Sequence, residues 1–146
     1  LCKVAGLFSR RSFNIDSLAV GETDDKEVSC MTIVSSGNQR TLEQIEKQLN
    51  KKLDIIKVRT FHEEQSISRE LMLIKVKYNR TNRKDIMEVC SILKAEIVDM
   101  SKSFMMIQIC AEPERIQLLI QMLKSISIVE VARTGTLALP KCAENE

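Results

Sequence analysis

The amino-acid sequence predicts an α+β protein made of two tandem β-α-β-β-α-β units, the first without its opening strand. Two observations lead to this prediction. In the second half of the chain, strand-like and helix-like periods follow one another in that order, and the first half repeats the order from its first helix onward. The chain has 146 residues, of which 44% are hydrophobic, so it can bury a hydrophobic core.

The second half contains four strand-like segments and two amphipathic helices. Residues 71–78 alternate apolar side chains with Lys75 and Lys77, which is a strand period. Thr81 or Asn82 can cap the helix that follows, and Pro113 suits the first position of the second helix. The predicted elements are a strand at 71–78, a helix carrying Ile86, Val89, Cys90 and Leu93, strands at 96–100 and 104–110, a helix carrying Ile116, Leu119, Ile120 and Leu123, and a strand at 126–132. This order is the split βαβ of ferredoxin-like folds.

The first half has the same order except for one strand. The predicted elements are a helix carrying Leu1, Val4, Ala5 and Phe8, strands at 13–21 and 28–35, a helix carrying Leu42, Ile45 and Leu49, and a strand at 54–61. Asn38 can cap the second of these helices. The missing strand would be central in the sheet, so we expect it upstream of Leu1. Residues 63–68 are polar and aperiodic and make a short linker, which places the domains at 1–63 and 69–146, the latter with a short tail.

Composition argues against several classes of partner. The 22 basic and 20 acidic residues nearly cancel, and aromatic residues make up only 3%, so neither a phosphate-tracking surface nor base-stacking platforms are expected. No apolar run approaches the ~20 residues that span a bilayer. We therefore expect no nucleic-acid and no membrane partner. The five cysteines are scattered, which favours free buried thiols and a cytoplasmic location, or an organelle matrix if a transit peptide lies upstream.

The sequence offers little for catalysis or metal binding. His62 is the only histidine, and none of the four glycines belongs to a phosphate-binding motif. The acidic pairs at 24–25 and 63–64 are expected in solvated turns, where their pKa values would not be tuned for acid–base work. We therefore predict no catalytic residue, no metal ligand and no cofactor in this chain.

Specific motifs in both halves resemble one known family. The segments GLFSRRSFNIDSL at 6–18, MTIV at 31–34 and EQIEKQLNKKLDIIKV at 43–58 resemble an ACT domain, and more narrowly the regulatory small subunit of acetolactate synthase, or acetohydroxyacid synthase. RELMLIKV at 69–76 and EVARTG at 130–135 are similar to the C-terminal domain of that family. The likeness covers nearly the whole chain in the family's order.

The resemblance implies a non-catalytic regulatory subunit. Such subunits form homodimers by edge-to-edge pairing of ACT domains, bind a branched-chain amino acid at the interface, usually valine, and control a separate catalytic large subunit. That partner carries thiamine diphosphate, magnesium and FAD. The small subunit activates it and makes it sensitive to feedback inhibition by the branched-chain amino acid. The alternative is a free-standing ACT-type amino-acid-binding regulator. A hydrolase on the same fold is less favoured, because it should show an anion-cradling loop and the loop at 79–82 has Arg80 but no glycine run.

The resemblance also implies an effector site. Asn14 matches the family's effector-contacting asparagine, and Ile15 beside it can contribute backbone from the paired subunit. Read without the resemblance, Asn14 is a turn residue between helix and strand. Two residues depart from the family pattern. Ser12 stands where a glycine is usual, at an expected helix C′ position that needs positive φ, and Cys30 replaces the arginine before MTIV.

Overall fold

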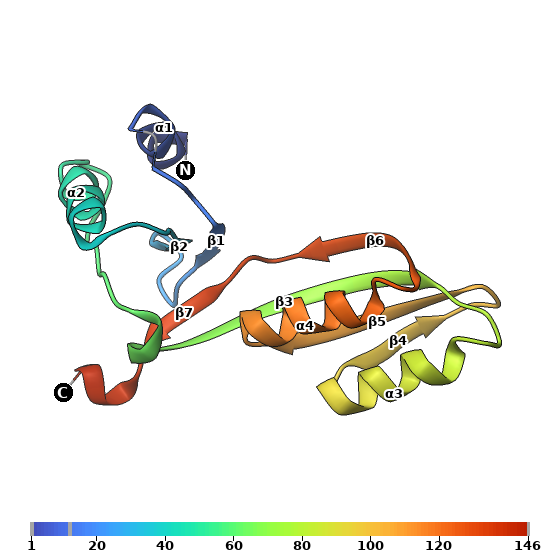
Figure 1. The fold of residues 1–146 in the computed structure, drawn as a ribbon. Helices are drawn as coiled ribbons and strands as arrows, with labels where there is room; N and C mark the ends of the chain where they lie inside the picture. Colours follow the sequence, from blue (N-terminus) through green and yellow to red (C-terminus); the bar gives the residue numbers. More distant parts are fainter. Residues whose placement is uncertain (1, 12, 146) are drawn as a thin grey trace. The chain divides into compact units, whose positions relative to one another are not determined.

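The chain divides into two compact units. The computed structural model describes residues 2–11 and 13–145. Packing groups Leu1–Ile67 with Ala138–Glu146 as one unit, and Ser68–Leu137 forms the other (Figure 1). The sequence had placed the whole segment from residue 69 to residue 146 in the second domain, whereas the packing assigns its last nine residues to the first unit. No helix within the described residues is long and apolar enough to cross a membrane.

The second unit has the predicted β-α-β-β-α-β order. Its elements are β3 (Ser66–Lys77), α3 (Arg83–Leu93), β4 (Glu96–Met100), β5 (Phe104–Ala111), α4 (Pro113–Leu123) and β6 (Ser127–Arg133). The strands lie in the order β4-β5-β3-β6, all antiparallel, and β7 (Leu137–Pro140) also pairs with β3. The first and third strands of the unit are neighbours, as the split βαβ arrangement requires. This confirms the predicted fold class.

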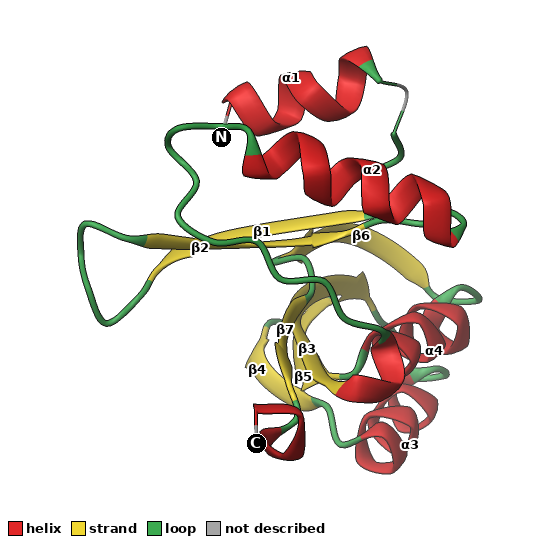
Figure 2. Ribbon diagram, turned by 90° about the vertical axis from the view of Figure 1, so that its left-hand side faces the viewer, coloured by secondary structure: helices red, strands yellow, loops and turns green. Residues whose placement is uncertain are grey.

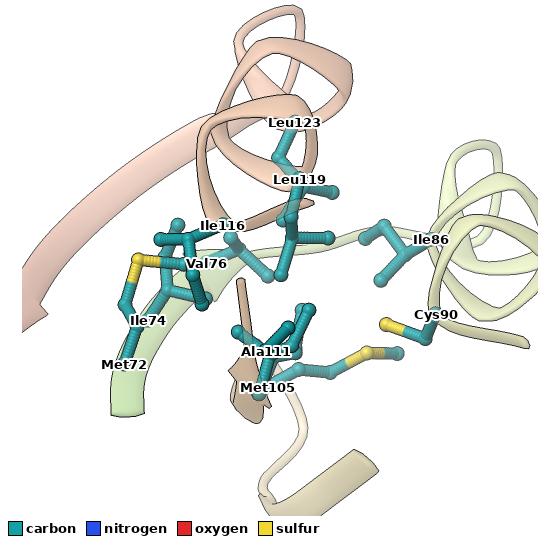
Figure 3. Close-up of a cluster of buried hydrophobic side chains, with 12 residues drawn as sticks. Met72, Ile74, Val76, Ile86, Cys90, Met105, Ala111, Ile116, Leu119 and Leu123 are labelled. Atoms are coloured by element: carbon teal, nitrogen blue, oxygen red, sulfur yellow. The ribbon is translucent and has the colours of Figure 1, made fainter. Parts of the chain in front are cut away.

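The core of the second unit lies between this sheet and its two helices. Alternation along β3 directs Met72, Ile74 and Val76 to one face, where they are fully buried, and leaves Leu71 and Leu73 partly exposed on the other. Helices α3 and α4 cover the buried face (Figure 1). Figure 3 shows their side chains meeting those of the strands. The buried set is Met72, Ile74, Val76, Ile86, Cys90, Met105, Ile107, Ile109, Ala111, Ile116, Leu119 and Leu123.

The ends of the helices follow partly from local sequence. Pro113 occupies the first turn of α4, as predicted. Asn82 stands at the N-cap of α3, but its side chain accepts a hydrogen bond from the Asn79 N–H at 2.8 Å and makes no capping bond to the helix. Lys94 is the C-cap of α3; it has φ of 59° and is the only non-glycine residue with positive φ in the described chain.

The first unit packs two helices on a β-hairpin. Its elements are α1 (Cys2–Arg10), β1 (Ser17–Glu22), β2 (Ser29–Val34), α2 (Gln39–Asn50) and the short 3₁₀ helices η1 (Glu63–Gln65) and η2 (Cys142–Asn145). The hairpin is antiparallel from Ser17↔Val34 to Glu22↔Ser29. Both helices lie on the same side of it (Figure 2). The buried residues between them are Val4, Leu7, Phe8, Ile45 and Leu49, with Phe13, Ile15, Met31, Ile33, Leu42, Ile55 and Val58 packed against them.

Three expectations about the first half and the linker are wrong. Residues 54–61 form no strand, and they share no ladder of hydrogen bonds with a strand of the described chain. Ile55 and Val58 reach the core, whereas Ile56 is 82% exposed, so Ile56 and Val58 do not share a face as the alternation of a strand at 54–61 would require. The expected linker at 63–68 is η1 and the first residues of β3.

The cysteines also differ from expectation. Of the four that the structure describes as free thiols, only Cys90 is buried, and Cys30, Cys110 and Cys142 are exposed. Cys30 lies in β2 and Cys110 in β5, and the side chains of both face away from the packed helices.

Candidate functional site

Asn14 and Ile15 lie in the short segment that joins α1 to β1. The end of α1 is closed by a hydrogen bond from the Phe13 N–H to the Phe8 carbonyl at 2.9 Å. The Phe13 ring meets the Phe8 ring edge-on, with centroids 5.9 Å apart and an interplanar angle of 75°. This contact anchors the start of the segment in the core, and Ile15 packs against the same core. Asn14, between these two anchors, is exposed to solvent.

A network of hydrogen bonds ties this segment to the end of β2. The Asn14 Nδ2 donates to Oδ1 of Asp16 at 2.5 Å, and the Ser36 hydroxyl donates to Oδ2 of the same carboxylate. The Ser35 hydroxyl donates to the Asn14 backbone carbonyl at 2.5 Å. The Asp16 N–H donates to the Val34 carbonyl at 2.7 Å. The end of β2 and the two serines after it therefore hold both the backbone and the side chains of residues 14–16 in place.

The chemistry of this site is that of a hydrogen-bond acceptor. Asn14 presents an amide oxygen and Asp16 a carboxylate, both on exposed residues, beside the half-buried Ile15. Such a group can accept N–H donors from an ammonium next to an apolar side chain. In residues 2–11 and 13–145 no three His, Cys, Asp or Glu side chains are grouped as a metal site would require.

Two surface hollows have linings that include neither Asn14 nor Ile15. One, of about 390 Å³, lies in the second unit and is lined by Leu93, Glu112, Glu114, Arg115 and Leu118. The other, of about 130 Å³, is lined by Arg59, Thr60, Phe61, Gln65 and Pro140. Asn14 and Asp16 are exposed at the surface of the single chain. Both β1 and β2 keep an outer edge that pairs with no other strand of the described chain.

The sequence reasoning missed three members of this network, namely Asp16, Ser35 and Ser36. Asp16 carries a usable signal, since residues two apart in an extended segment point to the same side. The serines carry none, because their role depends on how the end of β2 lies beside residues 14–16. Of the two residues that depart from the family pattern, Cys30 lies in β2 opposite Gly21 and is exposed, and Ser12 lies outside the described residues.

The EVARTG segment at 130–135 is the end of β6 and the turn after it. Arg133 donates from Nε to Oε1 of Glu70 at 2.6 Å and from Nη2 to Oε2 at 3.1 Å. Glu70 is almost fully buried on the helix-facing side of β3, and its hydrogen bonds raise the pKa of Arg133 above the ordinary value. Gly135, with φ of 86°, supplies the positive φ of the turn. The segment therefore has a structural role within the second unit.

Comparison with known proteins gives matches along nearly the whole chain. Residues 69–142 match the family described as the small subunit of acetolactate synthase, and residues 1–57 match the AHAS small subunit-like ACT domain. An acetolactate synthase small subunit from Mycolicibacterium smegmatis is 43% identical over 97% of this chain and 83% of its own length. A probable acetolactate synthase small subunit from Archaeoglobus fulgidus is 42% identical over 95% of this chain and 87% of its own.

A solved structure is similar as well. The crystal structure of the acetolactate synthase small subunit from Thermotoga maritima superposes with a TM-score of 0.88 at 34% sequence identity. The match covers 96% of this chain and 88% of the other.

Proposed function

The chain belongs to the acetolactate synthase small-subunit family and is a regulatory subunit that partners a catalytic one. We propose that it has two effects on this partner. It raises the activity of the catalytic large subunit and makes that subunit sensitive to feedback inhibition by a branched-chain amino acid, for which valine is the leading candidate. It contributes no catalytic group of its own. Thiamine diphosphate, magnesium and FAD belong to the large subunit.

The observation that carries the effector proposal is the exposed amide oxygen acceptor of Asn14 beside Ile15. A free amino acid brings an ammonium, a carboxylate and a side chain. The ammonium requires acceptors, which the Asn14 amide oxygen and strand carbonyls supply, and Ile15 lies beside them to meet an aliphatic side chain. For the carboxylate, the resemblance implies donors in the loop before the first helix, and we propose that free backbone N–H groups and the helix dipole favour the anion there.

A homodimer would complete this site. Asn14 is exposed, and the outer edge of β1 can accept another strand, so pairing of two ACT domains would enclose the ligand between copies. Regulation then requires that the ligand bind one arrangement of the dimer more tightly than another. A ligand with equal affinity for both arrangements would not shift the equilibrium between them.

Reconstitution with the catalytic subunit tests the proposal. Acetolactate formation is measured with and without the regulatory chain, over a range of L-valine concentrations. The expected result is a higher rate with the chain present and inhibition of that rate by valine. If the chain neither raises the rate nor introduces valine sensitivity, the proposed function is wrong. Valine binding without any effect on the catalytic subunit would favour the alternative of a free-standing amino-acid-binding regulator.

Substitution of Asn14 tests the site within the same assay. Asn14→Ala removes an acceptor for the ammonium, and the valine concentration for half-maximal inhibition should rise about tenfold or more, the cost of one hydrogen bond to a charged group. Activation in the absence of valine should persist. The matched control is Asn50→Ala, an exposed asparagine at the end of α2, which should leave the valine response unchanged.

A further inference from the structure

We propose that Asp16 is a positioning residue in the effector site, which holds the Asn14 amide with its nitrogen turned toward the Asp16 carboxylate and its oxygen turned toward the ligand. This inference rests on the proposed function and adds to it a residue that does not touch the ligand itself. The feature that carries it is the direct hydrogen bond between the two side chains, in which Asn14 Nδ2 donates to Asp16 Oδ1 at 2.5 Å.

The chemistry of the two groups decides the direction of the amide. An ionised carboxylate can only accept hydrogen bonds, whereas an asparagine amide has a donating end and an accepting end of almost the same size. With the amide reversed, Oδ1 of Asn14 would face Oδ1 of Asp16 at this distance, and two acceptors would repel. The carboxylate thus selects the orientation in which Asn14 Nδ2 is engaged and Oδ1 remains the acceptor that can meet an ammonium.

Asp16 is itself held in place. Its second carboxylate oxygen accepts from the Ser36 hydroxyl, and its backbone N–H donates to the Val34 carbonyl at 2.7 Å. The Ser35 hydroxyl fixes the Asn14 backbone through its carbonyl. Both ends of the Asn14–Asp16 contact are therefore supported by the end of β2. A binding group that is oriented before the ligand arrives loses less conformational entropy on binding.

A double-mutant cycle on the full chain in the reconstituted complex tests this role, with L-valine as the probe. Asp16→Asn replaces the acceptor-only group by one that tolerates either orientation of the Asn14 amide, with almost no change in size. The valine concentration for half-maximal inhibition should rise severalfold, up to about tenfold. In the Asn14→Ala background the same change should add less than about twofold, because Asp16 acts through Asn14. The rate without valine is measured for each variant, so that a loss of activation is separated from a loss of valine sensitivity.

Further variants separate orientation from other causes. Asp16→Glu keeps a carboxylate and should recover part of the valine sensitivity that Asp16→Asn loses. Ser36→Ala releases the far side of the carboxylate and should give a smaller shift in the same direction. Asp24→Asn removes the same charge in the turn between β1 and β2 and should leave valine sensitivity unchanged, which controls for net charge.

The outcomes distinguish this inference from the proposed function. If the unsubstituted complex does not respond to valine, both are wrong. If Asn14→Ala weakens the valine response and Asp16→Asn does not, the proposed function stands and Asp16 has no positioning role. Effects of the two substitutions that multiply in the double variant would also overturn the inference, since Asp16 would then act on the ligand independently of Asn14.

Discussion

Cys90 is a thiol whose surroundings predict its reactivity. It is buried in the core of the second unit between α3 and the sheet, and this burial raises the pKa of the thiol (Figure 3). In the native chain we expect Cys90 to resist a thiol reagent under conditions in which Cys30, Cys110 and Cys142 react, because those three are exposed. Peptide mapping by mass spectrometry after brief labelling measures this. Labelling of Cys90 as fast as that of the exposed thiols would contradict the assignment.

The same burial makes stability depend on pH at the alkaline end. Since the folded-state pKa of Cys90 is raised, its contribution is fully present below the unfolded-state value of about 8.5 and is lost as the pH rises through the folded-state pKa. The free energy of unfolding should therefore fall above about pH 8.5. Denaturant titrations at pH 7.5 and 9.5 measure the fall, and it should be smaller in Cys90→Ala, although that variant is less stable at both pH values.

The ion pair between Glu70 and Arg133 should contribute to the stability of the second unit. Arg133→Ala leaves a carboxylate almost fully buried without its cation, and should lower the free energy of unfolding by about 2 kcal/mol. Replacing both residues by leucine should recover much of the loss, since no charge then remains buried. Lys75→Ala is the control. Lys75 Nζ lies 3.9 Å from Glu130 Oε2 in an exposed pair, so removing this side chain should lower the free energy of unfolding by less than about 0.5 kcal/mol.

At the scale of elements, α2 is a helix whose start was predictable and can be tested. Asn38 has extended backbone, and its Oδ1 accepts from the Thr41 N–H at 2.8 Å, as the capping prediction requires. Asn38→Ala should destabilise the chain by about 1 kcal/mol, and Asn38→Ser, which keeps a capping oxygen, should lose much less. Thermal unfolding of the two variants compares them. Equal losses would show that the cap does not stabilise α2.

Elements also show where prediction from sequence ends. The helices and the strands of the second unit were predictable because an apolar face repeats every 3.6 or every 2 residues, which is a local property. The alternation at 54–61 has the same local appearance, yet a strand exists only where a neighbouring strand takes up its hydrogen bonds, and residues 54–61 pair with no strand of the described chain. The reverse holds at Leu137–Pro140. No strand was predicted there, yet these residues form β7 because they pair with β3.

At the scale of the whole molecule, the effector proposal predicts which part of the chain responds to valine. Binding at Asn14 should slow amide hydrogen exchange in residues 13–36, since the 14–16 segment is bonded to the end of β2. Exchange with and without saturating L-valine, followed by mass spectrometry, measures this. Asn14→Ala should remove the change. Protection that appears only within residues 68–137 would place the ligand elsewhere.

Taken by itself, the sequence determined the type and order of most elements, the two-unit plan and Asn14 as a candidate contact, because periodicity, caps and motifs are written in neighbouring residues. Tertiary structure decided which groups are partners across long separations. Asp16 and Ser36 are 20 positions apart, and Glu70 and Arg133 are 63 apart. No local pattern contains such pairs, since they exist only once strand ends and strand faces have been brought together by folding.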